Sequence, residues 1–484
     1  MQDTTMKRRA FVILTGFAFA LCDVKPVFAF DPLLTQGSIS STPAASLAPE
    51  TQTCVFGAPR SPMMLWEAVE RALCQNPKTR EAWADVKARA AAVGAARAAY
   101  LPTVSGTWQG VRDDSATDVH NRPELSSNSA ATVHSESASL NWVLFDFGGR
   151  HAALKNASAL LAAARATQDA TLQEQFATAT KDYYAAEAAQ GALEAARNIE
   201  QMTARSLVAA QARVDRGAAP LTDALQAQTQ HDEAVFNQTK AEGDAQTALG
   251  ALASDMGLGP DAAIVVPAVT ATPLPDRNYD QSIAQLIDEV KHTHPAVVAA
   301  QAQFEAARAK IAQARAEGLP RVSLVAKYAR NNQPASLGLG VPTFPATGRD
   351  AYIGVQVTIP LFEGFGRHYQ VRQAEAEAEH AQDAVDQATQ QVALDVWTNW
   401  QALRTATQNA AHSQTTLDNA QLAFDAAQHR YDHGVGNILE LLSTQTALAN
   451  AQQRHVQALA DWHTAKLQLA AKLGRLGMED ISRP

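Results

Sequence analysis

The chain contains one structural unit twice, because the marker residues of residues 66–257 recur in the same order in residues 284–474. The first markers recur 218 positions later and the others 217 positions later. The recurring pairs are Asn76-Pro77 with His294-Pro295, Leu101-Pro102 with Leu319-Pro320, Arg216-Gly217 with His433-Gly434, and Met256-Gly257 with Leu473-Gly474. Chance similarity between alanine-rich helices would not keep one register over this length. The sequence therefore predicts a fold built from two copies of one unit.

The first 29 residues have the parts of a secretory signal peptide. The basic run Lys7-Arg8-Arg9 precedes a short apolar stretch, and Val27-Phe28-Ala29 offers small residues to a signal peptidase. Removing residues 1–29 changes Lys+Arg from 40 to 36 and Asp+Glu from 49 to 47, so the net charge moves from -9 to -11. Nucleic acid is therefore not an expected partner. A second interpretation makes Cys22 a lipid-anchored N-terminus, although Leu21 precedes it where a small residue is preferred.

Removal of the signal would leave Cys54 and Cys74 as the two thiols of an exported chain. An even pair in an oxidising compartment favours a disulfide, which would attach the Pro/Ser-rich leader, residues 30–62, to the first helix. The other interpretation is two free, buried cysteines.

Alternation of apolar and polar residues predicts four strands, each with one apolar and one polar face. Past the signal, the chain contains no run of 18 apolar residues that would predict a membrane helix. Two strands are expected to start at the Leu-Pro steps, where proline costs no ladder hydrogen bond. The strands have about the ten residues that cross a bilayer at a tilt. The residues expected to face lipid are Trp142, Leu144, Ile353, Val355, Val357 and Ile359.

Four strands cannot close a barrel, and an open sheet edge cannot be left in lipid. The chain is therefore expected to oligomerise: two copies would give eight strands, and three would give twelve with room for a pore. Residues 113–136 and 331–350 are polar and are expected to form external loops at the hairpin tips.

Long helices are expected after the strands, because residues 148–213 and 366–430 are rich in Ala, Gln, Glu and Leu and lack proline. Shorter helices are expected over residues 66–99, 221–256, 286–317 and 438–473. Each repeat, residues 63–258 and 281–474, would thus read helix-strand-strand-helix-helix. Residues 259–280, with four prolines, form the linker, and residues 475–484 form a C-terminal tail.

These features resemble the TolC family of outer membrane export channels over essentially the whole mature chain. The resemblance rests on the repeated Leu-Pro, on the junctions at residues 144–150 and 361–367, and on the turn over residues 430–442. It implies a homotrimer in a Gram-negative outer membrane, with a 12-stranded β-barrel in lipid and a 12-helix α-barrel in the periplasm. The predicted fold class is thus mixed, all-α plus β-barrel, with four transmembrane β-strands per tandem-repeat protomer.

The two helix-to-helix turns, residues 215–223 and 432–440, are candidates for a periplasmic gate that contains Gly217, Gly434 and Gly436. Asp223 and Glu440 occupy equivalent repeat positions, so a trimer would gather six acids around one axis. A second interpretation is that both acids complement helix N-termini, with Thr222 as a capping candidate. The resemblance implies that Thr222, Asp223 and Tyr431 join a network that holds the tip shut. Gly436 and Ser443 replace an arginine and an acid expected in that network.

No motif predicts an enzyme, because the chain lacks a phosphate-binding loop, a nucleophile elbow and a zinc-binding helix motif. No cofactor or metal is expected. The predicted function is an export duct that docks a periplasmic adaptor and an inner membrane ABC or proton-driven transporter, with type I protein secretion favoured. Multidrug efflux is the alternative. A non-conducting structural or adhesive coiled-coil protein is the alternative of another class.

Overall fold

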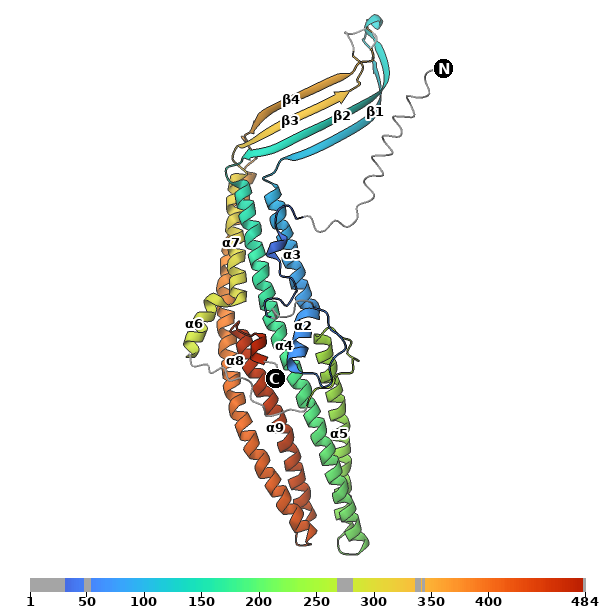
Figure 1. The fold of residues 1–484 in the computed structure, drawn as a ribbon, viewed down its shortest axis with the longest axis vertical. Helices are drawn as coiled ribbons and strands as arrows, with labels where there is room; N and C mark the ends of the chain where they lie inside the picture. The colour runs from blue at the N-terminus through green and yellow to red at the C-terminus, as the bar shows by residue number, and fades with distance from the viewer. Residues whose placement is uncertain (1–30, 48–53, 268–281, 336–340, 342–343, 482–484) are drawn as a thin grey trace, which may run out of the picture.

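The protein is an elongated molecule with a curved sheet at one end and long helices that run away from it (Figure 1). The computed structural model describes residues 31–47, 54–267, 282–335, 341 and 344–481. The expected signal peptide, Cys22 and most of the linker therefore lie outside the described residues. The helices end far from the sheet in two tight turns, one between α4 and α5 and one between α8 and α9 (Figure 1).

The two repeats give the same succession of elements. The first contains α2 (Leu65–Gln75), α3 (Pro77–Ala98), β1 (Thr103–Thr117), β2 (Ser127–Phe145), α4 (Gly149–Asp215) and α5 (Leu221–Asp255). The second contains α6 (Ile283–Thr293), α7 (Pro295–Ala316), β3 (Arg321–Asn331), β4 (Gly348–Thr358), α8 (Gly366–Asp432) and α9 (Ile438–Lys472). Short 3-10 turns are η1 (Gln36–Ser38), η2 (Pro123–Leu125) and η3 (Met478–Ile481). The long helices α4 and α8 each have 67 residues.

The first helix of each repeat is broken in two, so the expected single helices over residues 66–99 and 286–317 are wrong. Proline disfavours helical backbone in the residue before it, and Asn76 and His294 have ψ values of 133° and 131°. Each residue then caps the next helix: the Asn76 side chain accepts from the Lys78 amide at 2.9 Å, and His294 Nδ1 accepts from the Ala296 amide at 3.2 Å. The break lets α2 and α6 leave the axis of the longer helices.

The sharp step from each hairpin into its long helix is held by an arginine. Arg150 donates to the carbonyl oxygen of Val143 at 2.6 Å and pairs with Asp146 at 3.2 Å. In the second repeat, Arg367 pairs with Glu363 at 3.2 Å and with Glu317 at 2.9 Å. These bonds explain why both repeats keep an acid and an arginine at this junction.

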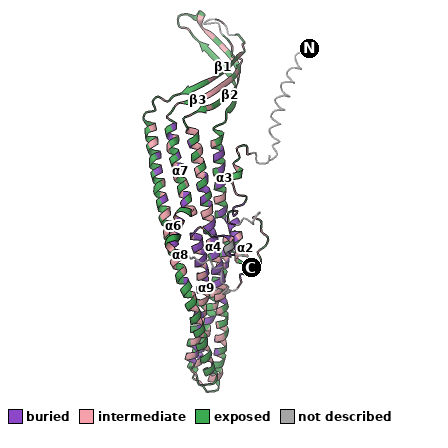
Figure 2. Cartoon of the chain, turned by 60° about the vertical axis from the view of Figure 1, so that its left-hand side comes forward, coloured by how far each residue is buried: buried purple, intermediate pink, exposed green. Residues whose placement is uncertain are grey.

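The main core lies at mid-length, where α2, α4, α9 and the C-terminal residues meet (Figure 2). Leu172 and Phe176 of α4 pack there with Leu252 and Met256, and all four are fully buried. The leader adds Met63, whose amide donates to the carbonyl oxygen of Val265 at 2.7 Å. The core thus joins the leader, both repeats and the C-terminus.

A disulfide bond joins Cys54 of the leader to Cys74 of α2, the pair expected from the sequence. It closes a loop with a sequence separation of 20. Cross-linking a loop of this length stabilises a protein by about 3 kcal/mol. The leader is therefore fastened beside the main core.

We expect the mature protein to have no alkylatable thiol when it is denatured without reductant. The Cys54→Ser, Cys74→Ser double variant is expected to lose about 3 kcal/mol of unfolding free energy, because its unfolded chain is less constrained. Alkylation followed by intact-mass measurement checks the first result, and denaturant unfolding checks the second. Two alkylated cysteines in the mature wild-type protein would contradict it.

The four strands form one antiparallel sheet in the order β1-β2-β3-β4. The sheet has two open edges within the protomer, one along β1 and one along β4. All fifteen residues of β1 are exposed, although a stable sheet normally covers at least one face. A single protomer therefore leaves this sheet incomplete.

The pairing of the four strands places apolar residues mostly opposite apolar residues and polar residues mostly opposite polar ones. The sheet therefore has an apolar face and a polar face. The apolar face contains Val104, Leu140, Trp142, Val322, Leu324, Ala326, Ile353, Val355 and Val357. The polar face contains Thr103, Ser105, Thr107, Ser137, Ser139, Asn141, Ser323, Lys327, Tyr352 and Gln356. Its hydroxyl groups bond across strands, with 2.8 Å between Ser105 and Ser139 and 2.6 Å between Thr107 and Ser137.

Three details of the strands differ from expectation. A register shift between Val143 and Phe145 leaves Leu144 without an opposite residue, and Phe145 instead pairs with Val322. Ile359 follows the last residue of β4, because Pro360 cannot continue the ladder. The first hairpin extends to Thr117 and Ser127, so most of the expected external loop over residues 113–136 is strand. The second tip lies partly outside the described residues.

Among the described residues, no helix combines the length and the apolarity that crossing a membrane requires.

Candidate functional site

The two tip turns are built alike, and each uses a glycine that ends a long helix. Gly217 and Gly434 have φ values of 70° and 75°, which glycine adopts without the steric cost of a Cβ. The amide of Ala218 donates to the Arg213 carbonyl oxygen at 2.9 Å, and the amide of Val435 donates to that of Arg430 at 3.0 Å. These bonds satisfy the last carbonyl groups of α4 and α8 and hold both turns tight.

Gly436 is required by a close backbone approach. A Cβ at this position would lie 2.7 Å from the Tyr431 nitrogen and 2.8 Å from the Arg430 carbonyl carbon. The Gly436 amide also donates to the Arg430 carbonyl oxygen at 2.9 Å. An arginine, which the family resemblance leads one to expect here, would not fit this turn without backbone movement.

Arg213 links the two helical hairpins of the protomer, α4–α5 and α8–α9, at the tip that their turns form. It extends from the last turn of α4 to the end of α8, where it donates a hydrogen bond to the carbonyl oxygen of Tyr431. Its guanidinium also lies over the Tyr431 ring, with 4.1 Å between the guanidinium carbon and the ring centroid. Tyr431 is only 4% exposed, so the cation–π contact is largely shielded from water.

Burial and charge also determine the protonation of Tyr431. Burial raises the pKa of the Tyr431 phenol above its ordinary value of 10.0, Arg213 opposes this rise, and Asp223 and Asp432 reinforce it. The phenol therefore stays neutral at physiological pH, and the ring remains an electron-rich partner for Arg213.

A second contact between the helical hairpins lies farther from the two turns than Arg213 does. Gln445 of α9 donates to the Ser206 hydroxyl of α4 at 2.8 Å, and both residues are buried. Around them, an apolar cluster includes Ala210 and Ala227 from the first hairpin and Ile438 and Leu441 from the second. The tip is thus a small core fastened by two polar contacts.

The two equivalent acids have different surroundings. Glu440 pairs with Arg430 at 2.9 Å, but the Arg430 side chain is exposed and that of Glu440 partly so, and the pair therefore stabilises little. Asp223 forms no ion pair within 4.0 Å among the described residues, and it lies close enough to Tyr431 to raise that residue's pKa. The two acids therefore differ in how far their charge is neutralised.

The expectation that Thr222 caps α5 is wrong. The residue before α5 is Pro220, which has no capping side chain, and Thr222 is the second residue of the helix. Asn437 caps α9 and accepts from the Leu439 amide at 2.9 Å. Asp223 and Glu440 both lie in the first turn of their helices, where a negative charge is favourable.

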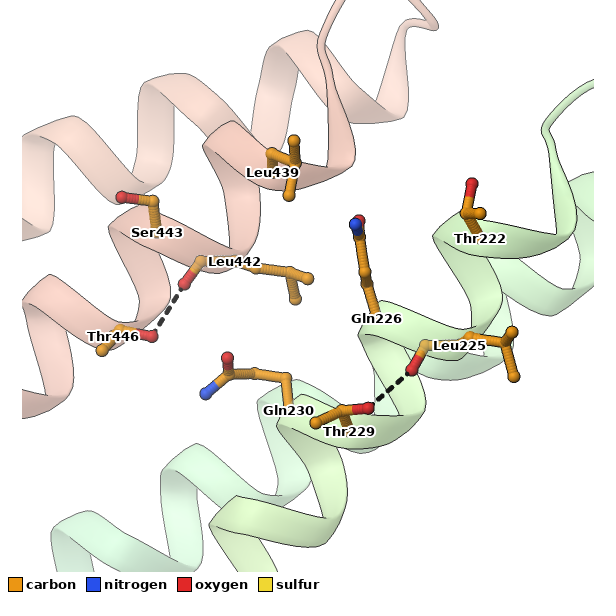
Figure 3. A pocket seen from close by; sticks show the side chains of 9 residues that line it. All are labelled: Thr222, Leu225, Gln226, Thr229, Gln230, Leu439, Leu442, Ser443 and Thr446. Carbon is orange, nitrogen blue, oxygen red and sulfur yellow. Dashed lines mark hydrogen bonds between the residues drawn. The ribbon is translucent and has the colours of Figure 1, made fainter.

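A groove of about 560 Å³ separates α5 from α9 beside the tip (Figure 3). Its apolar residues are Leu225, Leu439 and Leu442, and its polar residues include Thr222, Gln226 and Ser443 (Figure 3). Leu225 and Leu439 are 57% and 53% exposed, which leaves apolar surface open to a partner.

The structure brings Asp223, Tyr431 and Glu440 together at one end of the molecule. Thr222 lies at the same end, where its side chain lines the groove. Sequence reasoning missed Arg213, Ser206 and Gln445 as parts of this site. The hydrogen bond from Arg213 spans a sequence separation of 218, and no local pattern marks that pairing. An arginine in the last turn of a helix usually complements the helix C-terminus, so its second role was hidden.

The sequence matches the family described as outer membrane efflux protein over residues 68–258 and 286–475. The chain is 34% identical over 420 residues to Protein CyaE of Bordetella pertussis, with 87% of this chain and 85% of that protein covered. It is 24% identical over 429 residues to the outer membrane protein TolC of Escherichia coli, with 86% and 83% covered.

Solved structures agree on the fold. The outer membrane protein VceC of Vibrio cholerae superposes with a TM-score of 0.70 at 20% identity, with 85% of this chain and 96% of that chain covered. A membrane protein from Pseudomonas aeruginosa gives a TM-score of 0.73 at 22% identity, with 86% and 91% covered.

Proposed function

The chain belongs to the outer membrane efflux protein family, the TolC family, and we propose that it is the trimeric exit duct of a type I protein secretion system. It is an outer membrane export channel with a β-barrel in the membrane and a helical barrel in the periplasm. Transport through a duct needs no chemistry in the duct itself. The proposed partners are a periplasmic adaptor and an inner membrane transporter that supplies the energy.

The open sheet supports the trimer. Unpaired backbone groups along β1 and β4 cannot remain in lipid, so β4 of one copy is expected to pair with β1 of the next. Three copies give twelve strands, enough to enclose a pore.

Helix burial supports the same assembly. The equally long α4 and α8 have 21 and 8 buried residues among those described in the protomer. On α8, Leu394, Trp397 and Leu422 are 57%, 45% and 68% exposed, which leaves apolar side chains for a neighbouring copy to cover.

The observation that carries the duct is the second face of the sheet, which is mostly polar although Val143 and Val325 also lie on it. In a barrel whose apolar face meets lipid, the ladder of Ser, Thr and Asn side chains would line the lumen. A wall of hydroxyl groups with a few charges of both signs, among them Lys327 and Asp350, offers weak hydrogen bonds, which suits passage of varied cargo.

The groove between α5 and α9 supports adaptor docking. Its leucines and hydroxyl groups fit the amphipathic face of a helical hairpin, and it lies at the periplasmic end of the duct. The proposed partner for energy is an ABC transporter, with a proton-driven pump as the alternative.

Protein secretion is preferred because Leu21 makes Cys22 a poor lipid-anchor site, and lipid anchoring is frequent among outer channels of drug pumps. Efflux of small molecules is the second candidate, supported by relatives such as the outer membrane efflux protein BepC of Brucella suis, 27% identical over 419 residues.

A deletion strain separates these functions. Loss of particular proteins from the medium with unchanged drug sensitivity supports secretion, and the reverse result supports efflux. Complementation with the wild-type chain controls for effects of the deletion on neighbouring genes.

We predict that the acids at the tip make the channel cation-selective. Six carboxylates near one aperture attract cations and bind multivalent ones that block flow. Because Arg430 neutralises part of the charge on Glu440, Asp223→Ala is expected to reduce cation selectivity and block more than Glu440→Ala, and the double variant most. Reversal potentials in a salt gradient across planar bilayers measure this. Unchanged selectivity and block in verified double-variant trimers would leave both acids with a helix-stabilising role only.

A further inference from the structure

The apolar face of the sheet ends at one charged row, where a row is a set of residues that lie directly opposite one another across the four strands. This row lies toward the end of the sheet that is farther from the helices. The rows below it contain only apolar residues, tyrosine or glycine: Val104, Leu140, Ala326 and Ile353 in one, then Gly106, Ala138, Tyr328 and Ala351 in the next. The following row on the same face contains Trp108, Glu136, Arg330 and Arg349. The change from apolar to charged side chains therefore occurs within one step of the ladder.

The position of this row matches the outer boundary of the lipid. Eight residues separate Val357, near the periplasmic end of β4, from Arg349. At about 3.4 Å per residue and a tilt of about 40°, they span about 21 Å of the membrane normal, against an apolar band of about 25 Å. Phe362 and Phe365 lie just beyond the periplasmic end of β4, and Trp108 lies in the charged row, as aromatic residues do at both interfaces.

The two arginines of the row are placed against each other. Arg330 of β3 is directly opposite Arg349 of β4, and like charges in opposite positions destabilise a sheet. Both side chains are exposed. Within the described residues neither guanidinium has an ion pair within 4.0 Å, and Glu136, which is directly opposite Arg330, does not form one with it. An anion held between the two guanidinium groups would remove this repulsion.

We propose that Arg330 and Arg349 form a binding site for the phosphate groups of a phosphorylated glycolipid in the outer leaflet. Guanidinium groups bind phosphate oxygens through paired hydrogen bonds, and here they lie at the depth of lipid headgroups. Tyr328, one row below, would lie beside the upper part of the acyl chains. Three copies would place three such sites around the barrel. Bound lipid would fix the height of the barrel in the membrane.

The test uses full-length trimers purified in mild detergent, with a bisphosphorylated glycolipid and its dephosphorylated counterpart as probes. For wild-type protein, only the phosphorylated lipid is expected to raise the melting temperature and to remain bound in native mass spectra. Arg330→Gln with Arg349→Gln is expected to weaken that binding about tenfold or more, the scale of one lost charge-assisted hydrogen bond.

The matched control is Arg321→Gln with Lys327→Gln, which removes two positive charges from the polar face and is expected to bind lipid like the wild type. Equal lipid retention by the Arg330, Arg349 double variant would overturn the proposal. Equal stabilisation of the wild type by the dephosphorylated lipid would also overturn it, and that measurement needs no variant. A shift with inorganic phosphate alone would identify a free-anion site instead.

Discussion

Replacing Ile353 with arginine is expected to prevent the chain from assembling in the outer membrane. Ile353 lies in the middle of β4 on the apolar face of the sheet and is 74% exposed in the protomer. An arginine near the bilayer midplane costs about 2 to 4 kcal/mol, and a trimer contains the substitution three times. Heat-modifiable trimer in purified outer membranes, detected by electrophoresis, is expected to fall to a small fraction of the wild-type amount.

Gln356→Arg is the matched control, because Gln356 lies on the same strand but on the polar face, opposite Ser323. This variant is expected to assemble normally and to change conductance or ion selectivity. Equal assembly of the two variants would contradict the assignment of the faces, and loss of assembly only in Gln356→Arg would show that the faces are reversed.

Replacing Arg213 with alanine is expected to loosen the tip and raise the resting conductance several-fold. The substitution removes both the hydrogen bond to the Tyr431 carbonyl oxygen and the cation–π contact with its ring. Together such contacts stabilise by about 2 to 4 kcal/mol per protomer. Single-channel recording on verified trimers in planar bilayers measures the change.

Two variants separate this link from charge alone. Arg216→Ala removes the same charge three residues later, at an exposed position in the turn, and is expected to conduct like the wild type. Tyr431→Phe keeps the carbonyl acceptor and the aromatic face, so it is expected to change conductance less than Arg213→Ala. Equal conductance of Arg213→Ala and wild type would remove Arg213 from the gate.

The sequence predicts the long helices and the tip turns well, because both depend on local chemistry. Alanine, glutamine and glutamate favour helix over residues 148–213 and 366–430, and Gly217 and Gly434 end these helices by adopting positive φ. The helix breaks at Asn76 and His294 were also marked, by the prolines that follow them. The residues on both sides of each proline favour helix, which is why a single helix is expected in each place.

The lengths of β1 and β2 were underestimated for a different reason. Residues 127–136 consist mostly of serine, alanine, asparagine and threonine, so apolar and polar positions hardly differ. Their strand structure depends on pairing with β1, which no single segment reveals. The lipid-facing assignment of the remaining strand residues stays a prediction.

The sequence predicts where the site at the tip lies, but not which contacts hold it together. Repeat symmetry places Asp223 and Glu440 at equivalent positions, yet within the described part of the chain Glu440 forms an ion pair with an arginine and Asp223 does not. The contacts that join the helical hairpins, Arg213 with Tyr431 and Ser206 with Gln445, form because α4 packs against α9 across the repeats and ends beside the end of α8. Packing of that kind depends on the whole fold.

The central claim is that the assembled protein is a conducting duct, and single-channel recording of purified wild-type trimer tests it most directly. The trimer, verified by cross-linking, is reconstituted into planar lipid bilayers under a defined salt gradient. Discrete, long-lived current steps that are cation-selective are the predicted result. Verified trimers that insert without conducting, including those that carry Arg213→Ala to loosen the tip, would contradict the account.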